Sequence, residues 1–240
     1  MTLPRVADNR LLSALPISDR RRIVNSCEMV ELALAELVYS PWKPLDFIYF
    51  PISSFISLIM PTGDSTAFEV GLVGNEGMLG TALALNTDRS AERATVLGAG
   101  SALRMDASAL RREFRRGGAL RGVIDRYLHV RMGQLAQAAI CAQFHLLEGR
   151  VACRLLTTQD RAMANALNIT QEVLALKLGV RRAGITQAAS SLQQRRLIRY
   201  SRGIIDVLDR RGLMVAACSC YQADRDFRDR IADTRSARGG

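Results

Sequence analysis

Two short helical runs separated by a glycine constrain this chain more than any other feature of its sequence. The run QEVLALKL at 171–178 follows Thr170, a favourable helix N-cap, and stops at Gly179, which can adopt the positive φ of a tight turn. A second helical run is predicted over 182–193. Small or apolar residues at the right spacing would hold the two helices together: Ala175, Val180, Ile185 and Leu192. This spacing is typical of a helix-turn-helix.

A hairpin is predicted directly after the second helix. In LIRYSRGIIDVLD, residues 197–209, two short β-forming runs flank Ser201-Arg202-Gly203. Glycine in such a short connection favours a tight β-turn. The hairpin would form the wing of a winged helix-turn-helix.

The face of the second helix that points away from Ile185 and Leu192 carries polar side chains that can contact DNA. The candidates for contacts to base edges are Arg182, Thr186, Gln187 and Ser190. Arg182 suits guanine and Gln187 suits adenine; a phosphate contact for Arg182 and a solvated surface amide for Gln187 are the alternatives. The candidates for phosphate contacts, which position the protein without reading sequence, are Thr170, Arg181, Arg199, Ser201 and Arg202.

The charge distribution agrees with a polyanionic partner. The chain carries 33 Lys and Arg against 23 Asp and Glu, a net charge of +10. Residues 1–149 are almost balanced, whereas residues 150–240 hold 17 basic against 8 acidic residues. Such an excess indicates that the partner is double-stranded DNA or an anionic membrane. The alternative is a solvated basic face that has no partner. Two crossed helices and a hairpin favour DNA over a membrane surface.

The rest of the chain divides by its pattern. We expect a short helix over 10–26, then short β-strands broken by turn signals such as PTGDS at 61–65, up to residue 105. These strands indicate an antiparallel sandwich or barrel. Residues 120–148 read as one long helix, which is either a core helix or a dimer interface, and 150–165 as a further helix.

Several classes of protein are disfavoured by composition. No apolar run is long enough for a membrane span, and an odd count of five cysteines argues against a disulfide framework, so we expect a cytoplasmic protein. The chain has only two histidines, and we find no set of residues typical of a catalytic site. We therefore predict neither an enzyme nor a cofactor or metal site. Cys218 and Cys220 read as buried small hydrophobic residues, and His129 and His145 as structural.

Taken together, these segments resemble the Crp/Fnr superfamily of bacterial transcription regulators over residues 10–220. The resemblance lies in IYFPISSFISLIMPTGDSTAFEVGLVGNEGMLG, in HLLEGRVACRLL, and in the helix-turn-helix with its wing. It implies an α+β fold in three parts: an antiparallel, cyclic-nucleotide-binding-like β-roll over 1–118, a long dimerisation helix over 119–149 and a winged helix-turn-helix over 150–240. It also implies a homodimer on a near-palindromic operator, with RNA polymerase as a further candidate partner.

The chain departs from this superfamily at positions that bear on specificity. Ala183 and Gln187 stand where many members carry a base-reading Glu and Arg, so we expect an uncommon operator. Candidate effector-pocket residues are Glu76, Arg89 and Ser90, although Glu76 and Arg89 read better as a surface pair or a structural turn. Cys27 is the one N-terminal cysteine, too few for an iron–sulfur cluster. We therefore predict a regulator without cyclic-nucleotide gating, and keep a sensor for a small effector of unknown identity as the alternative.

Overall fold

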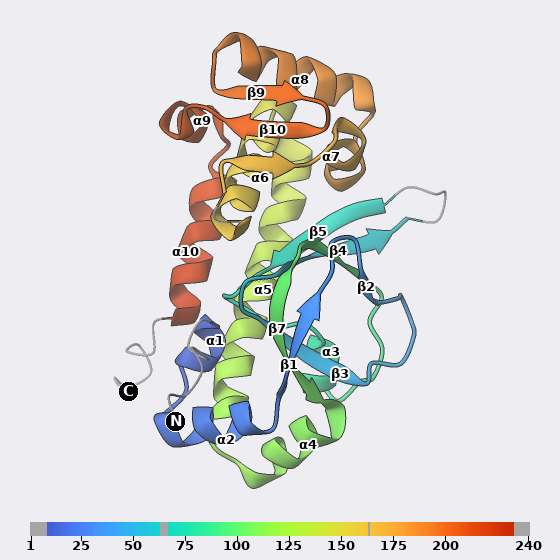
Figure 1. Cartoon of the computed structure of the whole chain (residues 1–240), viewed down its shortest axis with the longest axis vertical. Coiled ribbons are helices and arrows are strands. Elements are labelled where there is room, and N and C mark those ends of the chain that lie inside the picture. The colour runs from blue at the N-terminus through green and yellow to red at the C-terminus, as the bar shows by residue number, and fades with distance from the viewer. Residues whose placement is uncertain (1–8, 63–66, 163, 233–240) are drawn as a thin grey trace. The chain divides into compact units, whose positions relative to one another are not determined.

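A computed structural model of the chain describes residues 9–62, 67–162 and 164–232 (Figure 1). The chain forms two compact units. The first unit comprises the described parts of Met1–Leu58, Leu72–Gly133 and Phe227–Gly240. The second unit comprises the described parts of Ile59–Gly71 and Gln134–Asp226. Each unit has its own hydrophobic core.

The first unit begins with two helices where the sequence predicted one. Helix α1 spans Arg10–Ser13 and helix α2 spans Ile17–Asn25. Pro16 separates them, because proline has no N–H to continue a helical hydrogen-bond ladder. The side chain of Asn9 caps α1 by accepting from the Leu12 N–H at 3.1 Å.

A β-roll of antiparallel strands follows, as the short runs predicted. Its strands are β1 (Glu28–Leu32), β2 (Leu37–Tyr39), β3 (Phe47–Pro51), β4 (Phe55–Pro61), β5 (Ala67–Val73), β6 (Arg93–Gly98) and β7 (Gly100–Asp106), with the short helix α3 (Thr81–Ala84) between β5 and β6. They form two sheets, with strand orders β1-β7-β3 and β2-β6-β4-β5. Residues 63–65 of the predicted PTGDS turn lie outside the described residues.

Two helices complete the first unit's core. Helix α4 spans Ala107–Arg116, and helix α5 spans Ala119–Phe144 and continues into the second unit. Ile124 and Tyr127 of α5 are fully buried. The Tyr127 hydroxyl donates to the Met78 carbonyl at 3.1 Å, which ties α5 to the segment after β5.

The second unit surrounds helix α6, which spans Leu147–Ala162. Its other elements are β8 (Ala166–Asn168), α7 (Gln171–Leu178), α8 (Arg182–Gln194), β9 (Ile198–Ser201), β10 (Ile204–Val207) and α9 (Arg210–Ala216). Helix α10 (Cys220–Ala232) begins in this unit, and its residues from Phe227 onward belong to the first unit. The three strands pair antiparallel in the order β8-β10-β9. The long helix predicted over 120–148 is α5, which ends earlier, at Phe144. The helix predicted over 150–165 is α6, which begins at Leu147 and ends at Ala162.

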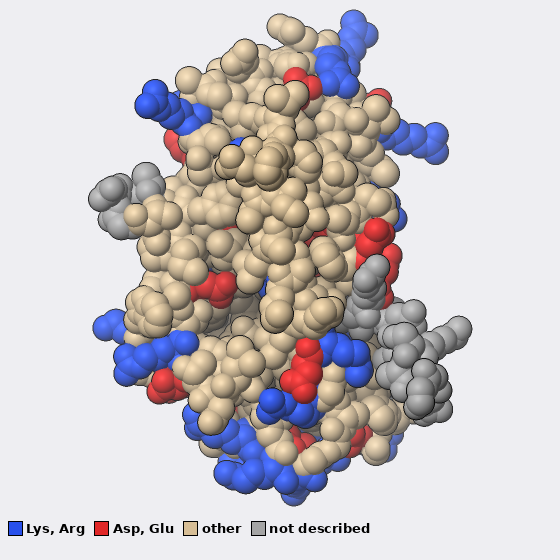
Figure 2. Space-filling view, turned by 180° about the vertical axis from the view of Figure 1, so that it is seen from behind, with Lys and Arg blue, Asp and Glu red and all other residues tan. Residues whose placement is uncertain are grey.

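Basic side chains gather at one end of the first unit, around α2 and α4 (Figure 2). The arginines there are Arg20, Arg21, Arg22, Arg111, Arg112, Arg115 and Arg116. The near balance of charge over residues 1–149 therefore conceals a local positive patch. Among the described residues, no helix is both long and apolar enough to cross a membrane.

Candidate DNA-binding site

The turn between α7 and α8 has the predicted geometry. The Thr170 hydroxyl oxygen accepts a hydrogen bond from the Val173 N–H at 3.2 Å and so caps α7. Gly179 ends the helix at φ +63°, in the left-handed region that favours glycine. A Cβ atom there would also lie 3.0 Å from the ring of Phe68. Both reasons require glycine at this position.

Helix α8 has one buried and one exposed face. The residues that face the core of the second unit are Ile185, Ala188, Ala189 and Leu192, all buried. All four predicted base-contact residues, Arg182, Thr186, Gln187 and Ser190, are exposed. Arg182, Thr186 and Ser190 are spaced by four residues, which places them along one side of the helix. This exposed polar side is available to a partner.

The N-terminal part of this exposed face is ordered by contacts to α7. Arg182 forms an ion pair with Glu172, with Nη1 and Oε1 2.7 Å apart. The Thr186 hydroxyl donates to the Gln171 side-chain carbonyl at 2.8 Å. Both contacts are exposed, so exchanging them for contacts to DNA costs at most about 1 kcal/mol each.

The wing is a hairpin with a two-residue loop. Strands β9 and β10 pair from Ser201 with Ile204 outward, which leaves Arg202 and Gly203 as the connection. Both loop residues have positive φ, 48° and 82°, as a type I′ turn requires. The sequence predicted a positive φ at Gly203. It did not reveal that Arg202 also has a positive φ.

The predicted phosphate-contact residues divide into two groups. Arg181, Ser201 and Arg202 are exposed. Thr170 and Arg199 already have partners within the protein: Thr170 caps α7, and Arg199 is bonded to Asp206 at 2.9 Å. A phosphate contact from Arg199 would therefore compete with an acidic neighbour on the wing.

A buried charge cluster that the sequence did not reveal underlies α7. Glu69 on β5 accepts hydrogen bonds from Lys177 on α7 and from Arg154 on α6, each at 2.6 Å. The three side chains are less than 10% exposed, at 4%, 5% and 9% respectively. Burial lowers the pKa of Lys177 to about 8, an effect that Glu69 opposes and Arg154 reinforces. The cluster holds the end of the β4–β5 hairpin to both helices.

This cluster changes how the excess of basic residues over 150–240 is interpreted. Lys177 is buried against Glu69 and does not face solvent. Arg195 is paired with Glu148 and Arg210 with Asp160, both at 2.6 Å. Part of the positive charge in the sequence thus holds the second unit together, and the exposed cations near the motif, chiefly Arg181, Arg182 and Arg202, remain for a partner.

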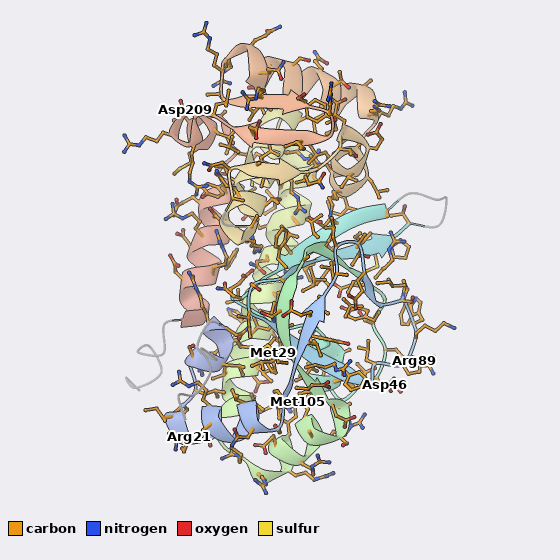
Figure 3. All side chains as sticks on the ribbon, viewed as in Figure 1. Arg21, Met29, Asp46, Arg89, Met105 and Asp209 are labelled. Atoms are coloured by element: carbon orange, nitrogen blue, oxygen red, sulfur yellow. The ribbon has the colours of Figure 1, made fainter. Side chains whose placement is uncertain are left out.

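The three effector-pocket candidates lie in different surroundings. Glu76 is buried, so the predicted surface pair with Arg89 is wrong. Arg89 is exposed in the loop between α3 and β6 (Figure 3). Its guanidinium donates to the Trp42 carbonyl at 2.9 Å. Ser90 accepts from the Glu92 N–H at 3.2 Å. Arg89 thus joins its loop to the segment after β2, and Ser90 holds the bend up to Glu92. The assignment of these residues to an effector pocket stays a prediction.

The structure also brings together cysteine and histidine side chains that the sequence left apart. The ligand atoms of Cys141, His145, Cys218 and Cys220 lie within 4.8 Å of one another. Hydrogen bonds from Cys141 and Cys153 hold the pKa of Cys218 well below its usual range. Cys220 is buried, as the sequence predicted, whereas Cys218 is only partly buried. Both thiols have side-chain partners that the sequence did not reveal, Cys141 for Cys218 and His145 for Cys220. The sequence contains two local spacings at this site, Cys218-x-Cys220 and Cys141-x-x-x-His145, but nothing in it indicates that these two pairs, more than 70 residues apart, meet.

Comparison with known proteins agrees with this geometry. A family model described as the Crp-like helix-turn-helix domain matches residues 149–215. The fold is similar to FixK2 from Bradyrhizobium japonicum, at a TM-score of 0.68 and 13% identity over 80% of this chain and 98% of that one. It is also similar to a putative transcriptional regulator of the Crp/Fnr family from Eubacterium rectale, at a TM-score of 0.68 and 17% identity over 86% of this chain and 96% of that one. No curated protein sequence matches the chain.

A third structure is that of the c-di-GMP-responsive global regulator CLP from Xanthomonas campestris. It matches at a TM-score of 0.63 and 17% identity, over 80% of this chain and 99% of that one. The Eubacterium rectale structure is described as a transcriptional regulator and CLP as a global regulator of gene expression. These matches confirm the resemblance to the Crp/Fnr superfamily: the chain has the fold of these regulators and contains a Crp-like helix-turn-helix domain.

Proposed function

We propose that this chain is a homodimeric transcription regulator that inserts α8 into the major groove of DNA and is not gated by a cyclic nucleotide. The observation that carries the proposal is the exposed side of α8, where Arg182, Thr186 and Ser190 stand opposite a buried apolar face. Side chains at this spacing can reach successive base edges, while the wing contacts the backbone. A regulator of this kind acts on DNA in the cytoplasm.

The second half of α5 supports the dimer. Met132, Leu135 and Ile140 are 65%, 41% and 46% exposed, and their spacing places them on one side of α5. Small residues between them, Ala136 and Ala139, allow close approach of another helix. Burial against the same helix of a second copy would cover these side chains.

The surroundings of the glycine-rich segment GNEGMLG, residues 74–80, support a regulator without cyclic-nucleotide gating. A Cβ at Gly77 would lie 2.5 Å from the Tyr127 hydroxyl, so this glycine makes room for a core aromatic residue. The Gly77 carbonyl accepts from the Asn9 side chain at 2.9 Å. Internal packing thus accounts for the segment without a phosphate ligand. We expect cyclic AMP, cyclic GMP and c-di-GMP to leave the thermal midpoint unchanged; a concentration-dependent rise would establish the effector-sensing alternative.

The proposal is tested by selecting random duplex DNA with the purified full chain, without added ligand, at two salt concentrations. A dimer predicts a two-fold-symmetric motif whose half-sites are about 34 Å apart, one helical turn. Sedimentation of the free protein checks the dimer independently. Salt-sensitive binding without any motif would contradict sequence-specific recognition.

Arg182→Ala is expected to relax base preference at one position of each half-site and to weaken specific binding by about 1–3 kcal/mol. The reason is the loss of a bidentate contact to guanine. Competition binding against a panel of operators with single base changes measures this effect. Equal weakening on every sequence would instead assign Arg182 to a phosphate.

Arg202→Ala is expected to weaken binding to all sequences alike and to reduce the slope of log K against log salt by about one unit. Arg202 lies at the tip of the wing and is exposed, so it can neutralise one phosphate. The slope is measured by titrations at several salt concentrations. An unchanged slope would remove the wing tip from the interface.

A further inference from the structure

We propose that Cys141, His145, Cys218 and Cys220 bind a structural Zn²⁺ ion. Cys141 lies in the last turn of α5 and His145 directly after that helix ends. Cys218 lies between α9 and α10, and Cys220 is the first residue of α10. All four belong to the second unit. Two junctions between helices, distant in the sequence, thus meet at one cluster.

The distances fit a tetrahedral ion. The Sγ atoms of Cys141 and Cys218 are 3.7 Å apart, and His145 Nδ1 lies 3.2 Å from Cys220 Sγ. Zinc–sulfur bonds of about 2.3 Å give tetrahedral edges of about 3.8 Å between sulfurs, and about 3.6 Å between sulfur and nitrogen. The most separated ligand atoms, within 4.8 Å, need to approach by about 1 Å.

The ligand set selects the metal. Three thiolates with one imidazole form one of the common structural zinc sets, and soft sulfur ligands disfavour Mg²⁺ and Ca²⁺. Four protein ligands leave no open position for substrate, so the site is structural rather than catalytic. A disulfide between Cys141 and Cys218 is the competing use of these thiols, but it would involve neither Cys220 nor His145.

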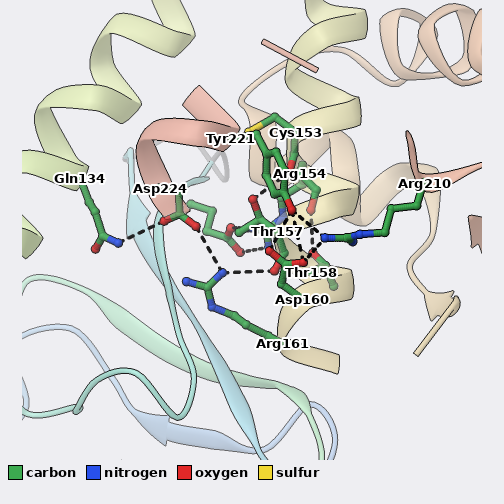
Figure 4. Close-up of polar contacts among 11 residues, drawn as sticks. Gln134, Cys153, Arg154, Thr157, Thr158, Asp160, Arg161, Arg210, Tyr221 and Asp224 are labelled. Carbon is green, nitrogen blue, oxygen red and sulfur yellow. Dashed lines mark hydrogen bonds and ion pairs between the residues drawn. The ribbon is translucent and has the colours of Figure 1, made fainter. Parts of the chain in front are cut away.

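Surrounding contacts position the ligands. The Cys218 N–H donates to the Gly149 carbonyl at 3.2 Å, and a Cβ at Gly149 would lie equally close, 3.2 Å, to the Cys218 nitrogen. The Gln137 amide donates to Cys220 Sγ at 3.1 Å, the kind of outer contact that supports a metal-bound thiolate. Side-chain bonds hold α10 in place nearby (Figure 4), among them Gln134 to Asp224 at 3.1 Å.

A bound ion would act on stability. It would join the end of α5 and the start of α10 beside α6, the helix around which the helix-turn-helix is packed. Because the unfolded chain has no preformed site, the free energy of metal binding would add to the free energy of folding of the second unit. Zinc would therefore set the stability of the DNA-binding unit without contacting DNA.

The test is the metal content of the full chain, purified under reducing conditions without chelators. We expect about one zinc per chain, released in stoichiometric amounts when the thiols are modified. Replacing zinc with Co²⁺ is expected to produce thiolate charge-transfer bands and the intense visible bands of a tetrahedral ion. Removing zinc with a chelator is expected to lower the thermal midpoint, and adding Zn²⁺ alone to restore it.

Variants separate the four ligands from the other cysteines. Cys141→Ser and Cys218→Ser are expected to lower the bound zinc at least about tenfold, and Gln137→Ala to weaken zinc affinity about 10–100-fold. Cys27→Ser, in the first unit, and Cys153→Ser, which removes a thiol beside Cys218 but outside the four, are matched controls that are expected to keep their zinc. The cobalt spectrum of the wild-type chain keeps the proposal testable should a ligand variant fail to fold.

Three results would overturn the proposal. The first is wild-type protein that contains no zinc and takes up neither Zn²⁺ nor Co²⁺. The second is iron with acid-labile sulfide in place of zinc. The third is a Cys141–Cys218 disulfide, found by mass spectrometry in protein kept free of oxidants, which would make the cluster a redox pair.

Discussion

Glu69→Gln is expected to lower the free energy of unfolding by about 3–5 kcal/mol, the largest effect of any single substitution considered. Glu69 is the carboxylate between the buried Arg154 and Lys177. Glutamine keeps the shape of the side chain but removes its negative charge. Arg154 and Lys177 then remain buried without the carboxylate that balances their charge. Urea unfolding, followed by fluorescence or circular dichroism, measures the loss.

Two further variants test that the cause is charge. Lys177→Met leaves the Glu69–Arg154 pair intact and is expected to cost less than about half as much. The double variant Glu69→Gln/Lys177→Met is expected to be more stable than Glu69→Gln alone, because it removes one of the two remaining cations. A Glu69→Gln protein within about 1 kcal/mol of wild type would show that the cluster is not electrostatically coupled.

Ile185→Ala is expected to lower the free energy of unfolding by about 2–5 kcal/mol and to reduce DNA binding to every sequence. Ile185 is fully buried in the first turn of α8, and truncating its side chain leaves a cavity beneath the helix that carries the base-contact candidates. Urea unfolding gives the stability, and hydrogen exchange of the α7 and α8 amides shows whether the loss is local.

Gln187→Ala is the matched control on the same helix. Because Gln187 is exposed, its stability is expected to stay within about 0.5 kcal/mol of wild type, while its base preference changes. Equal stability of the two variants would contradict the assignment of buried and exposed faces on α8.

Most of the helix-turn-helix could be predicted from the sequence because local rules define it. The Thr170 cap, the glycine at position 179 and the alternation of apolar and polar residues along α8 act over a few residues. The same holds for the wing, where Gly203 marks the turn. Element ends were less predictable: Pro16 divides the first helix, and α5 ends before His145.

The sequence by itself determined the antiparallel β-rich region, the two crossed helices, the wing and the exposed side of α8, because hydrophobic period, caps and turn residues are written in neighbouring positions. Only the tertiary structure decided which charges are available and which cysteines meet. From the sequence alone Lys177 would be a surface cation, but in the fold it is buried against Glu69 of β5. Cys141 lies 77 residues from Cys218, and only the fold brings their side chains together. Such partners depend on packing between distant segments, and no local pattern specifies them.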